Sequence, residues 1–472
     1  MVDRRQFLLA AGSYALATDR SEAKVGSALS EKLAGKITFK GEPHYEALRQ
    51  AASFNARKPN RYPEAIVLPA GEDDVVAAVK LARERGWQVT ARSGGHAWSG
   101  SHTLDRSVQI NLARMSEIRV DDAGGVVAVS PSVYGNVLNK KLREDYQLFT
   151  PTAHGVNVGI GGFVMCGGHG WNSRVFGLGC ANLKALDVVT SKGDLIHASE
   201  TDNSDYYWAA RGSGPGYFGV AVRYYLQLHP KPKIMRTAGF IFGISECETV
   251  IGWVRETMAE FPRSLEVVLI GKEVDGVPML QLSGHCLADS DEEVNGAMAL
   301  LQRCPAVARA QQKWVRDIVV PFDVEPPTDI NPTGARFAVD NIWTNASTEA
   351  LLPLMRPLLT DRPTPKSYIF MQVWGPVQHL PDMAYSTQAD IYISSNAVYY
   401  DPSDDARCET WAVQAMRRLD SISAGAQMND ENIEHHPARY LSEAAYRRLE
   451  ALRRKHDPER RFPGFIKPDP LA

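Results

Sequence analysis

Short apolar runs alternate with amphipathic segments near the start of the chain. The run Ala65–Leu68 precedes the amphipathic segment Glu72–Arg85, and a second run, Trp87–Ala91, follows it. The middle segment has acidic residues in its first turn, basic residues in its last turn and Gly86 behind it, which is the pattern of an α-helix and its stop. We therefore predict a strand, a helix and a strand in this order.

Two more elements are predicted from local patterns. A helix is predicted over residues 41–56, where apolar residues recur at spacings of three and four. A hairpin is predicted over residues 183–199, because two apolar runs are joined at Lys192 and Gly193.

The pattern changes after Pro230. Residues 233–425 contain few glycine clusters and alternate β-like runs with amphipathic helical segments. We therefore predict a separate α+β domain here, after an N-terminal domain over residues 26–232. Residues 426–472 form a C-terminal segment that includes a basic helix, and the predicted fold class of the whole chain is α+β.

Composition excludes several classes of protein. The chain has 472 residues, which indicates more than one domain, and a net charge of −3, which does not favour binding to nucleic acid or to an anionic membrane. No apolar run of about 18 residues is present, so a membrane-spanning helix is not expected. The six cysteines include no C-x-x-C pair, and their number permits disulfides without requiring them.

The N-terminus has its own pattern. Arg4 and Arg5 precede a short apolar run that ends near Ala17, and this resembles a twin-arginine export signal over residues 1–25. Asp3 departs from the usual pattern, and the alternative is an amphipathic first helix of a cytosolic protein. The signal predicts a periplasmic or secreted protein that is exported folded, with its cofactor in place.

Two glycine-rich stretches are the strongest chemical signal. Arg92–Gly100 places His96 among glycines at the end of a predicted strand, and Val158–Gly170 is a second cluster. Consecutive glycines expose backbone N–H groups that bind phosphate, and they let the backbone approach a flat ring closely. His96 is therefore a packed residue, a metal ligand or a nucleophile toward a ligand lying on this backbone.

Four motifs in order carry a resemblance to a known family. They are "RSGGHAWSG", "VGIGGFVMCGGHG", "WAARGSGPGYFGV" and "RRLEALRRKHDPERRF". The chain resembles the vanillyl-alcohol-oxidase (PCMH-type) FAD flavoproteins, and among them the berberine-bridge-enzyme-like oxidases. The resemblance implies two α/β subdomains that bind FAD, a substrate domain with an antiparallel sheet, and a C-terminal segment that returns to the FAD domain.

The resemblance also implies which residues bind FAD. They are Arg92, Ser93, Gly94, Gly95, His96, Ala97, Ser99, Val158, Gly159, Gly161, Gly162, Cys166, Gly167, Gly168, Gly170, Gly219, Val220 and Asn429.

Covalent attachment of the flavin is implied at one residue. In the family, the histidine at the position of His96 is bonded to the flavin 8α-methyl; the alternative is a histidine that supports the flavin without a bond. The cysteine that makes a second bond in many relatives is replaced by Gly155, so a single bond is expected. Cys166 is either close to the flavin or a small core thiol.

Two other motifs are discounted. The stretch Gly214–Gly219 matches G-x-G-x-x-G, but it is predicted to follow a helix and to precede a strand, whereas a dinucleotide fingerprint needs the reverse order. His435 and His436 have no third ligand at helical spacing and are followed by Pro437, so a metal site is not expected.

The catalytic base departs from the family pattern. The family's tyrosine lies in a Tyr-x-Asn-Tyr stretch, and here Gln427 occupies its place while Asn429 is kept. Glutamine cannot act as a base at neutral pH, so it is expected to position substrate. Alternative proton acceptors, each of which could equally be a core or supporting residue, are Tyr385, Tyr392, Tyr400 and His169.

The function implied is an FAD-dependent oxidoreductase. It is expected to remove a hydride from an alcohol, sugar, phenolic compound or amine and to pass the electrons to O2 or another acceptor. The alternatives are a dehydrogenase that excludes O2 and a secreted flavin-binding protein without turnover.

Overall fold

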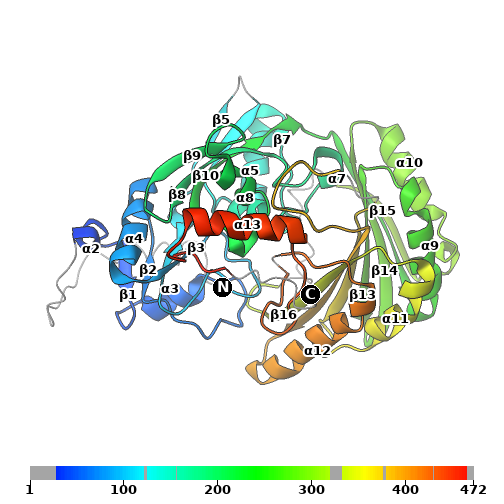
Figure 1. Cartoon of the computed structure of the whole chain (residues 1–472). Coiled ribbons are helices and arrows are strands. Elements are labelled where there is room, and N and C mark those ends of the chain that lie inside the picture. Colours follow the sequence, from blue (N-terminus) through cyan, green and yellow to red (C-terminus); the bar gives the residue numbers. More distant parts are fainter. Residues whose placement is uncertain are drawn as a thin grey trace.

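The structure, a computed structural model, describes residues 28–121, 125–155, 157–318, 332–375, 379–428 and 430–464. The predicted export signal and Asn429 lie outside these residues. Within them the strands form four sheets, and three of these sheets belong to the N-terminal part of the chain (Figure 1).

The first sheet confirms the predicted strand, helix and strand. Its order is β1-β2-β4-β3, with β2, β4 and β3 parallel and β1 antiparallel to β2. Gly86 ends the helix with a φ of 67°, a left-handed conformation that glycine adopts easily. The elements are α2 (Ala28–Lys32), β1 (Ile37–Phe39), α3 (Tyr45–Ala51), β2 (Ala65–Val67), α4 (Glu72–Arg85), β3 (Gln88–Arg92) and β4 (Ser107–Asn111).

The helix predicted over residues 41–56 is shorter than expected. Helix α3 begins only at Tyr45, because Gly41 and His44 have φ values of 88° and 70°, which an α-helix does not allow. The prediction rested on apolar spacing alone and did not detect these turns.

The second sheet is antiparallel, in the order β5-β6-β10-β8-β9. The predicted hairpin is confirmed as β8 and β9, and Gly193 in its turn has a φ of 82°. The elements of this region are β5 (Ile118–Asp121), β6 (Val126–Val129), α5 (Gly135–Lys141), β7 (Leu148–Phe149), α6 (Ile160–Met165), α7 (Ser173–Phe176), β8 (Leu183–Thr190), β9 (Leu195–Ser199), α8 (Ser204–Ala210), β10 (Gly219–Gln227) and β11 (His229–Pro230), which pairs with β7.

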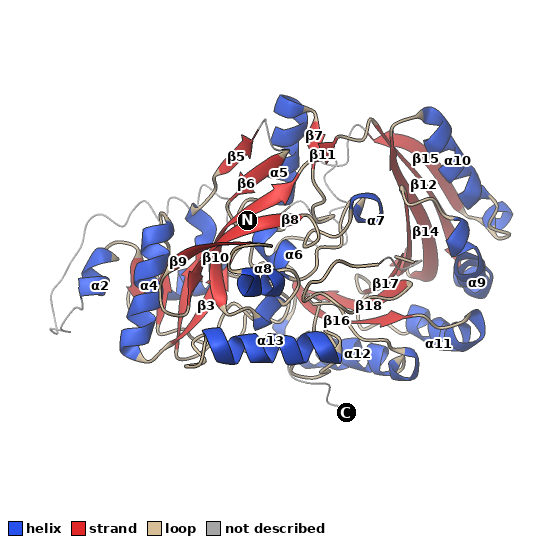
Figure 2. Cartoon of the chain, turned by 45° about the horizontal axis from the view of Figure 1, so that its top comes forward, coloured by secondary structure: helices blue, strands red, loops and turns tan. Residues whose placement is uncertain are grey.

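The third large sheet forms the predicted α+β region. Its order is β15-β12-β14-β13-β17-β18-β16, and every pair in it is antiparallel. Helices α9 to α12 cover one face of this sheet (Figure 2), where apolar side chains such as Phe240, Leu282 and Ile393 are buried. The elements are β12 (Ile234–Gly243), α9 (Cys247–Thr257), β13 (Leu265–Val274), β14 (Val277–Ala288), α10 (Asp291–Gln302), β15 (Gln312–Ile318), β16 (Arg336–Thr344), α11 (Thr348–Thr360), β17 (Tyr368–Val373), β18 (Ile391–Tyr399) and α12 (Asp405–Arg417).

The C-terminal segment returns to the N-terminal sheets. Its helix α13 (Glu443–His456) places Leu449 in the same hydrophobic core as Phe218. Arg453 is 1% exposed and donates to the backbone carbonyl of Gly216 at 2.7 Å. Among the described helices, none is long and apolar enough to cross a membrane.

Candidate active site

A cavity lies where the loop after β3, the start of α6 and the turn before β10 meet. Phe462 of the C-terminal segment also lines it. The predicted cofactor residues in its lining are Ser93, Gly94, Gly95, His96, Ala97, Val158, Gly159, Gly161, Gly162, Cys166 and Gly219. The two glycine-rich stretches, far apart in the sequence, therefore share one wall.

The glycines of this wall lie backbone against backbone. A Cβ atom added to Gly94 would lie 2.5 Å from the Gly159 nitrogen, and one added to Gly159 would lie 2.7 Å from the Gly94 nitrogen. Only glycine allows this approach. At Gly162, by contrast, an added Cβ would meet no described atom within 4 Å, so this position faces open space.

Unpartnered polar groups show what the cavity can hold. The backbone amides of residues 94–97 donate to no acceptor within the described part of the chain. The Tyr217 hydroxyl is buried at the cavity and is likewise without a described partner. Successive free amides bind pyrophosphate, and buried polar groups require partners. The lining therefore fits a nucleotide cofactor with a flat ring, as FAD requires.

The other predicted cofactor residues shape the loops behind this wall. Arg92 is buried and donates to the backbone carbonyls of Ser93 and Gly94 at 2.7 and 2.9 Å. The Ser99 hydroxyl donates to the Glu431 carboxylate at 2.6 Å, which ties the first glycine loop to the C-terminal segment.

Part of the second glycine cluster serves packing. A Cβ atom on Gly167 would lie 2.7 Å from the ring of Tyr385. Gly168 packs against the ring of a phenylalanine, and Gly170 packs against a backbone carbonyl. Val220, next to Gly219 on β10, is fully buried in the hydrophobic core.

His96 is held as a neutral imidazole. Burial is the main cause that lowers its pKa, to about 4, and a hydrogen bond to Asn157 only partly opposes this. Its Nε2 lies 3.0 Å from the Asn157 Oδ1, and its ring stacks on Phe54 with centroids 4.4 Å apart. Sequence reasoning missed Asn157, which directly precedes the second glycine cluster.

Tyr385 and His169 form one hydrogen-bonded pair. The Tyr385 hydroxyl lies 3.1 Å from the His169 Nε2, and the His169 Nδ1 is buried without a partner among the described atoms. Burial lowers the pKa of His169 to about 3 and raises that of Tyr385 well above its usual value. Both groups are therefore neutral, packed beside Trp343 and Trp374.

Tyr392 forms a second pair, with a carboxylate. Its hydroxyl donates to the Asp430 Oδ2 at 2.5 Å, and the Trp98 indole donates to the Oδ1 at 2.8 Å. The Trp98 ring lies edge to face with His96, with centroids 5.7 Å apart. The structure thus links the candidate base Tyr392 to His96. Sequence reasoning missed Asp430, although it stands where the family stretch has its second tyrosine.

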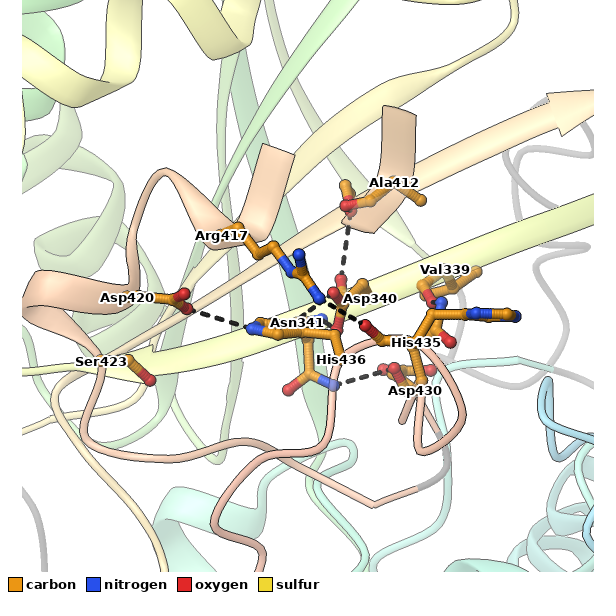
Figure 3. A network of polar contacts seen from close by, with 12 residues as sticks. Val339, Asp340, Asn341, Ala412, Arg417, Asp420, Ser423, Asp430, His435 and His436 are labelled. Carbon is orange, nitrogen blue, oxygen red and sulfur yellow. Dashed lines mark hydrogen bonds and ion pairs between the residues drawn. The ribbon is translucent and has the colours of Figure 1, made fainter. Parts of the chain in front are cut away.

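Gln427 and Tyr400 occupy different surroundings. The Gln427 backbone amide donates to the Asn341 Oδ1 at 2.7 Å, and the Asn341 amide donates to the carbonyls of Gln427 and Asp430 at 3.0 and 2.9 Å. Asn341 on β16 is fully buried, so it holds this loop to the large sheet (Figure 3). Tyr400 is 53% exposed beyond the end of β18 and does not join the other candidates.

The two histidines discounted as metal ligands lie in the same network (Figure 3). The His436 Nδ1 lies 2.6 Å from Asp340 and its Nε2 lies 3.0 Å from Asp420, while the His435 side chain is 53% exposed. Burial opposes a charge on His436, but the hydrogen bond to Asp340 and the two carboxylates outweigh it and raise its pKa. No group of three metal-ligating side chains is arranged as a metal site among the described residues.

Comparison with known proteins identifies the family. Residues 63–199 match the FAD binding domain family. The FAD-linked oxidoreductase janO of Penicillium janthinellum is 31% identical over 430 residues, which cover 89% of this chain and 95% of that protein. The (R)-6-hydroxynicotine oxidase of Paenarthrobacter nicotinovorans is 26% identical over 325 residues, covering 67% of this chain and 68% of that protein.

The fold is shared with solved structures. The BBE-like 1 protein of Physcomitrella patens superposes with a TM-score of 0.80 at 18% identity, over 94% of this chain and 100% of that chain. The sequence similarity and the shared fold both agree with the glycine-lined cavity described above, which fits FAD. The chain belongs to the FAD-linked oxidoreductases with the PCMH-type, berberine-bridge-enzyme-like fold, and it is an FAD-dependent oxidoreductase.

Proposed function

We propose that the protein is an oxidase that removes a hydride from a small alcohol, sugar, phenolic compound or amine and uses O2 as the electron acceptor. The observation that carries this proposal is the shared wall of the two glycine stretches, with His96 at the cavity and a tyrosine–carboxylate pair joined to it through Trp98. The relative from Paenarthrobacter nicotinovorans is itself named an oxidase.

The glycine loops hold the cofactor, and FAD, when bound, supplies the hydride acceptor. The free amides of residues 94–97 bind its pyrophosphate, and the open position at Gly162 leaves room for it. The Tyr217 hydroxyl supplies one more hydrogen bond within the cavity.

His96 carries the single covalent bond to the flavin in this proposal. A neutral imidazole has one N–H and one nitrogen lone pair. The Asn157 Oδ1 accepts a hydrogen bond from Nε2–H, so the lone pair is left on Nδ1, which becomes the bonding atom. Because burial keeps the pKa of His96 near 4, the imidazole has a free lone pair at neutral pH.

A substrate panel tests the reaction. Purified protein is mixed anaerobically with alcohols, sugars, phenolic compounds and amines, the flavin absorbance is followed, and air is then admitted while H2O2 is measured. We expect at least one substrate class to bleach the flavin and air to restore it with stoichiometric H2O2. Reduced flavin that persists in air would make the protein a dehydrogenase. Reduction by light but by no panel member would make it a flavin-binding protein.

We further propose export through the twin-arginine pathway. This rests on Arg4 and Arg5 ahead of the short apolar run. Replacing both by lysine should retain the full-length protein in the cytoplasm, whereas the wild type should be recovered outside it, shortened at its N-terminus. Equal distribution of the two proteins would contradict export by this route.

A further inference from the structure

We propose that Asp430, through the hydroxyl of Tyr392, accepts the substrate proton in this protein. The inference deepens the proposed function and rests on it. It replaces the family's tyrosine base, whose place is taken by Gln427, with a pair contributed by strand β18 and the C-terminal segment.

The surroundings of Asp430 are unusual for a structural carboxylate. Both of its oxygens accept hydrogen bonds from neutral donors, the Tyr392 hydroxyl and the Trp98 indole. No lysine, arginine or histidine of the described chain forms an ion pair with it. As a whole residue Asp430 is half-buried. An interior carboxylate without a cation, whose pKa is raised by burial, is a feature of functional sites.

The position of the pair relative to the cofactor fits the role. Trp98 contacts His96 on one side and Asp430 on the other, so one indole separates the carboxylate from the flavin anchor. Cys166 lines the cavity, and the charges of Asp430 and Glu431 add to burial in raising the pKa of its thiol. The charge of Asp430 therefore acts on a residue of the cavity lining, while its carboxylate bonds to Tyr392.

The electrostatics favour proton uptake by Asp430. Burial raises the pKa of Asp430, and the hydrogen bonds from Tyr392 and Trp98 oppose this only in part. The titratable groups that face Asp430 are Tyr392 on β18, Tyr368 on β17, Cys166 at the end of α6 and its neighbour Glu431. None of these groups is a cation, so no positive charge adds to the two hydrogen bonds in lowering the pKa of Asp430. A base is most effective when its pKa lies near the working pH.

The proton and the hydride leave the substrate for different acceptors. For an alcohol, the substrate O–H proton passes to the Tyr392 oxygen while the Tyr392 proton passes to the Asp430 carboxylate. Bound FAD would supply the acceptor for the hydride, which carries the electron pair of the C–H bond, and the carbonyl product would remain. One proton and one hydride leave each substrate, so atoms and electrons balance, and Tyr392 is restored as a phenol.

The geometry of the pair is maintained by β16. Asn341 donates to the backbone carbonyls of Gln427 and Asp430 and accepts from the Gln427 amide. Figure 3 shows Asn341 beside Asp430. A fully buried side chain on the edge strand of the large sheet therefore sets the position of a carboxylate that belongs to an irregular loop.

Matched variants test the proposal. Asp430→Asn keeps the shape and an acceptor oxygen but cannot take a proton at neutral pH, Tyr392→Phe removes the relay, and Asp430→Glu keeps the carboxylate. Tyr400→Phe is the control, because Tyr400 is exposed and away from the site. Anaerobic flavin reduction is measured against pH, with flavin content and thermal unfolding as checks of folding.

We expect Asp430→Asn and Tyr392→Phe to slow reduction by about 10²–10⁴-fold with little change in substrate affinity. Wild-type reduction should rise with pH through an acid limb that Asp430→Asn lacks and Asp430→Glu partly restores. Tyr400→Phe should reduce as the wild type does. Normal reduction by Asp430→Asn with its acid limb intact would overturn the proposal, and a loss confined to Tyr392→Phe would make the tyrosine alone the acceptor.

An infrared measurement is independent of turnover. The C=O band of a protonated carboxyl group is followed against pH in the resting, flavin-loaded protein. We expect a band that titrates above the ordinary range of aspartate and is absent in Asp430→Asn. Its absence from the wild type would overturn the role of Asp430 even if no substrate reduced the flavin, whereas its presence without any reduction would overturn only the proposed oxidase function.

Discussion

The two sides of the candidate active site are built from different parts of the chain. The cofactor side is made of backbone, because residues 94–97 offer amides and Gly94 lies against Gly159 with no side chain between them. The proton-accepting side is made of side chains, in which Asp430 meets partners 38 and 332 positions away. A site made of backbone requires glycines, which can be recognised as a motif in the sequence. A pair of side chains from distant segments produces no such local motif.

The largest effect is expected where backbone meets backbone. In Gly159→Ala the added Cβ would lie 2.7 Å from the Gly94 nitrogen, so the two loops must separate. We expect loss of nearly all bound flavin and a lower unfolding temperature, since overpacking costs about 1–3 kcal/mol.

Gly162→Ala is the matched control for this comparison. Its Cβ meets no described atom, so the apoprotein should unfold as the wild type does and only the flavin content should fall. Flavin-to-protein absorbance and thermal unfolding measure both effects. Normal flavin loading in Gly159→Ala would show that the two loops do not form the cofactor wall.

The second effect concerns the side-chain network behind Asp430. Because the folded-state pKa of His436 is raised, its charge stabilises the fold below its ordinary pKa, and this contribution is lost as the pH rises through the raised value. His436→Gln removes the cation beside Asp340, a carboxyl whose pKa burial raises to about 6 even with His436 present, so near pH 6 Asp340 can take up a proton instead. Near pH 6 we therefore expect a loss of about 1–3 kcal/mol in the free energy of unfolding, from the broken buried hydrogen bond.

The deficit of His436→Gln should shrink toward pH 9, which denaturant unfolding at both pH values measures. His435→Gln, at the neighbouring exposed histidine, should change little. A deficit that grows with pH would contradict the charged state assigned to His436.

A third, smaller effect distinguishes the two hydrogen-bonded tyrosines. Tyr385→Phe leaves the buried His169 Nε2 without its partner, at a cost of about 1–3 kcal/mol in stability. Because burial holds the pKa of His169 near 3, the pH dependence of flavin reduction should not change. Stopped-flow reduction across pH measures this, and a shifted profile would assign the proton to His169 after all.

The smallest effect is expected at Gln427. Its backbone amide remains bonded to Asn341 in Gln427→Ala, so only a positioning hydrogen bond is lost. Such a bond is worth about 0.5–1.5 kcal/mol, or roughly tenfold in rate at most. Flavin reduction should slow modestly with an unchanged pH profile. If Gln427→Ala abolishes reduction, Gln427 and not the Tyr392–Asp430 pair governs the chemistry.

The same contrast explains what could be predicted from the sequence. The strand, helix and strand that precede the loop of His96 were predictable, because a helix charge pattern and a glycine stop are local signals. The turn before β10 and the hairpin at Gly193 were predictable for the same reason. The rest of the architecture was predicted from the resemblance of four motifs to a known family.

The proton-accepting side could not be predicted in this way. Asp430 is a candidate only because the folded chain brings Tyr392 and Trp98 into hydrogen-bond contact with it. Asn341 is a candidate only because strand β16 packs against the loop that contains Asp430. An aspartate in a polar stretch is typical of a solvated loop, so no local sequence pattern could have identified Asp430 as a functional residue.

The attachment of the flavin is tested most directly by peptide mapping of the denatured, proteolysed protein. Burial keeps His96 neutral beside the cofactor wall, and Cys166 lines the same cavity with a thiol whose pKa burial raises far above its usual value. A thiol in that state is a poor nucleophile. The account predicts one flavin-bearing peptide, which contains His96 and lacks Cys166, and no such peptide in His96→Ala. A flavin that is entirely released on denaturation, or that joins the His96 and Cys166 peptides, would contradict it.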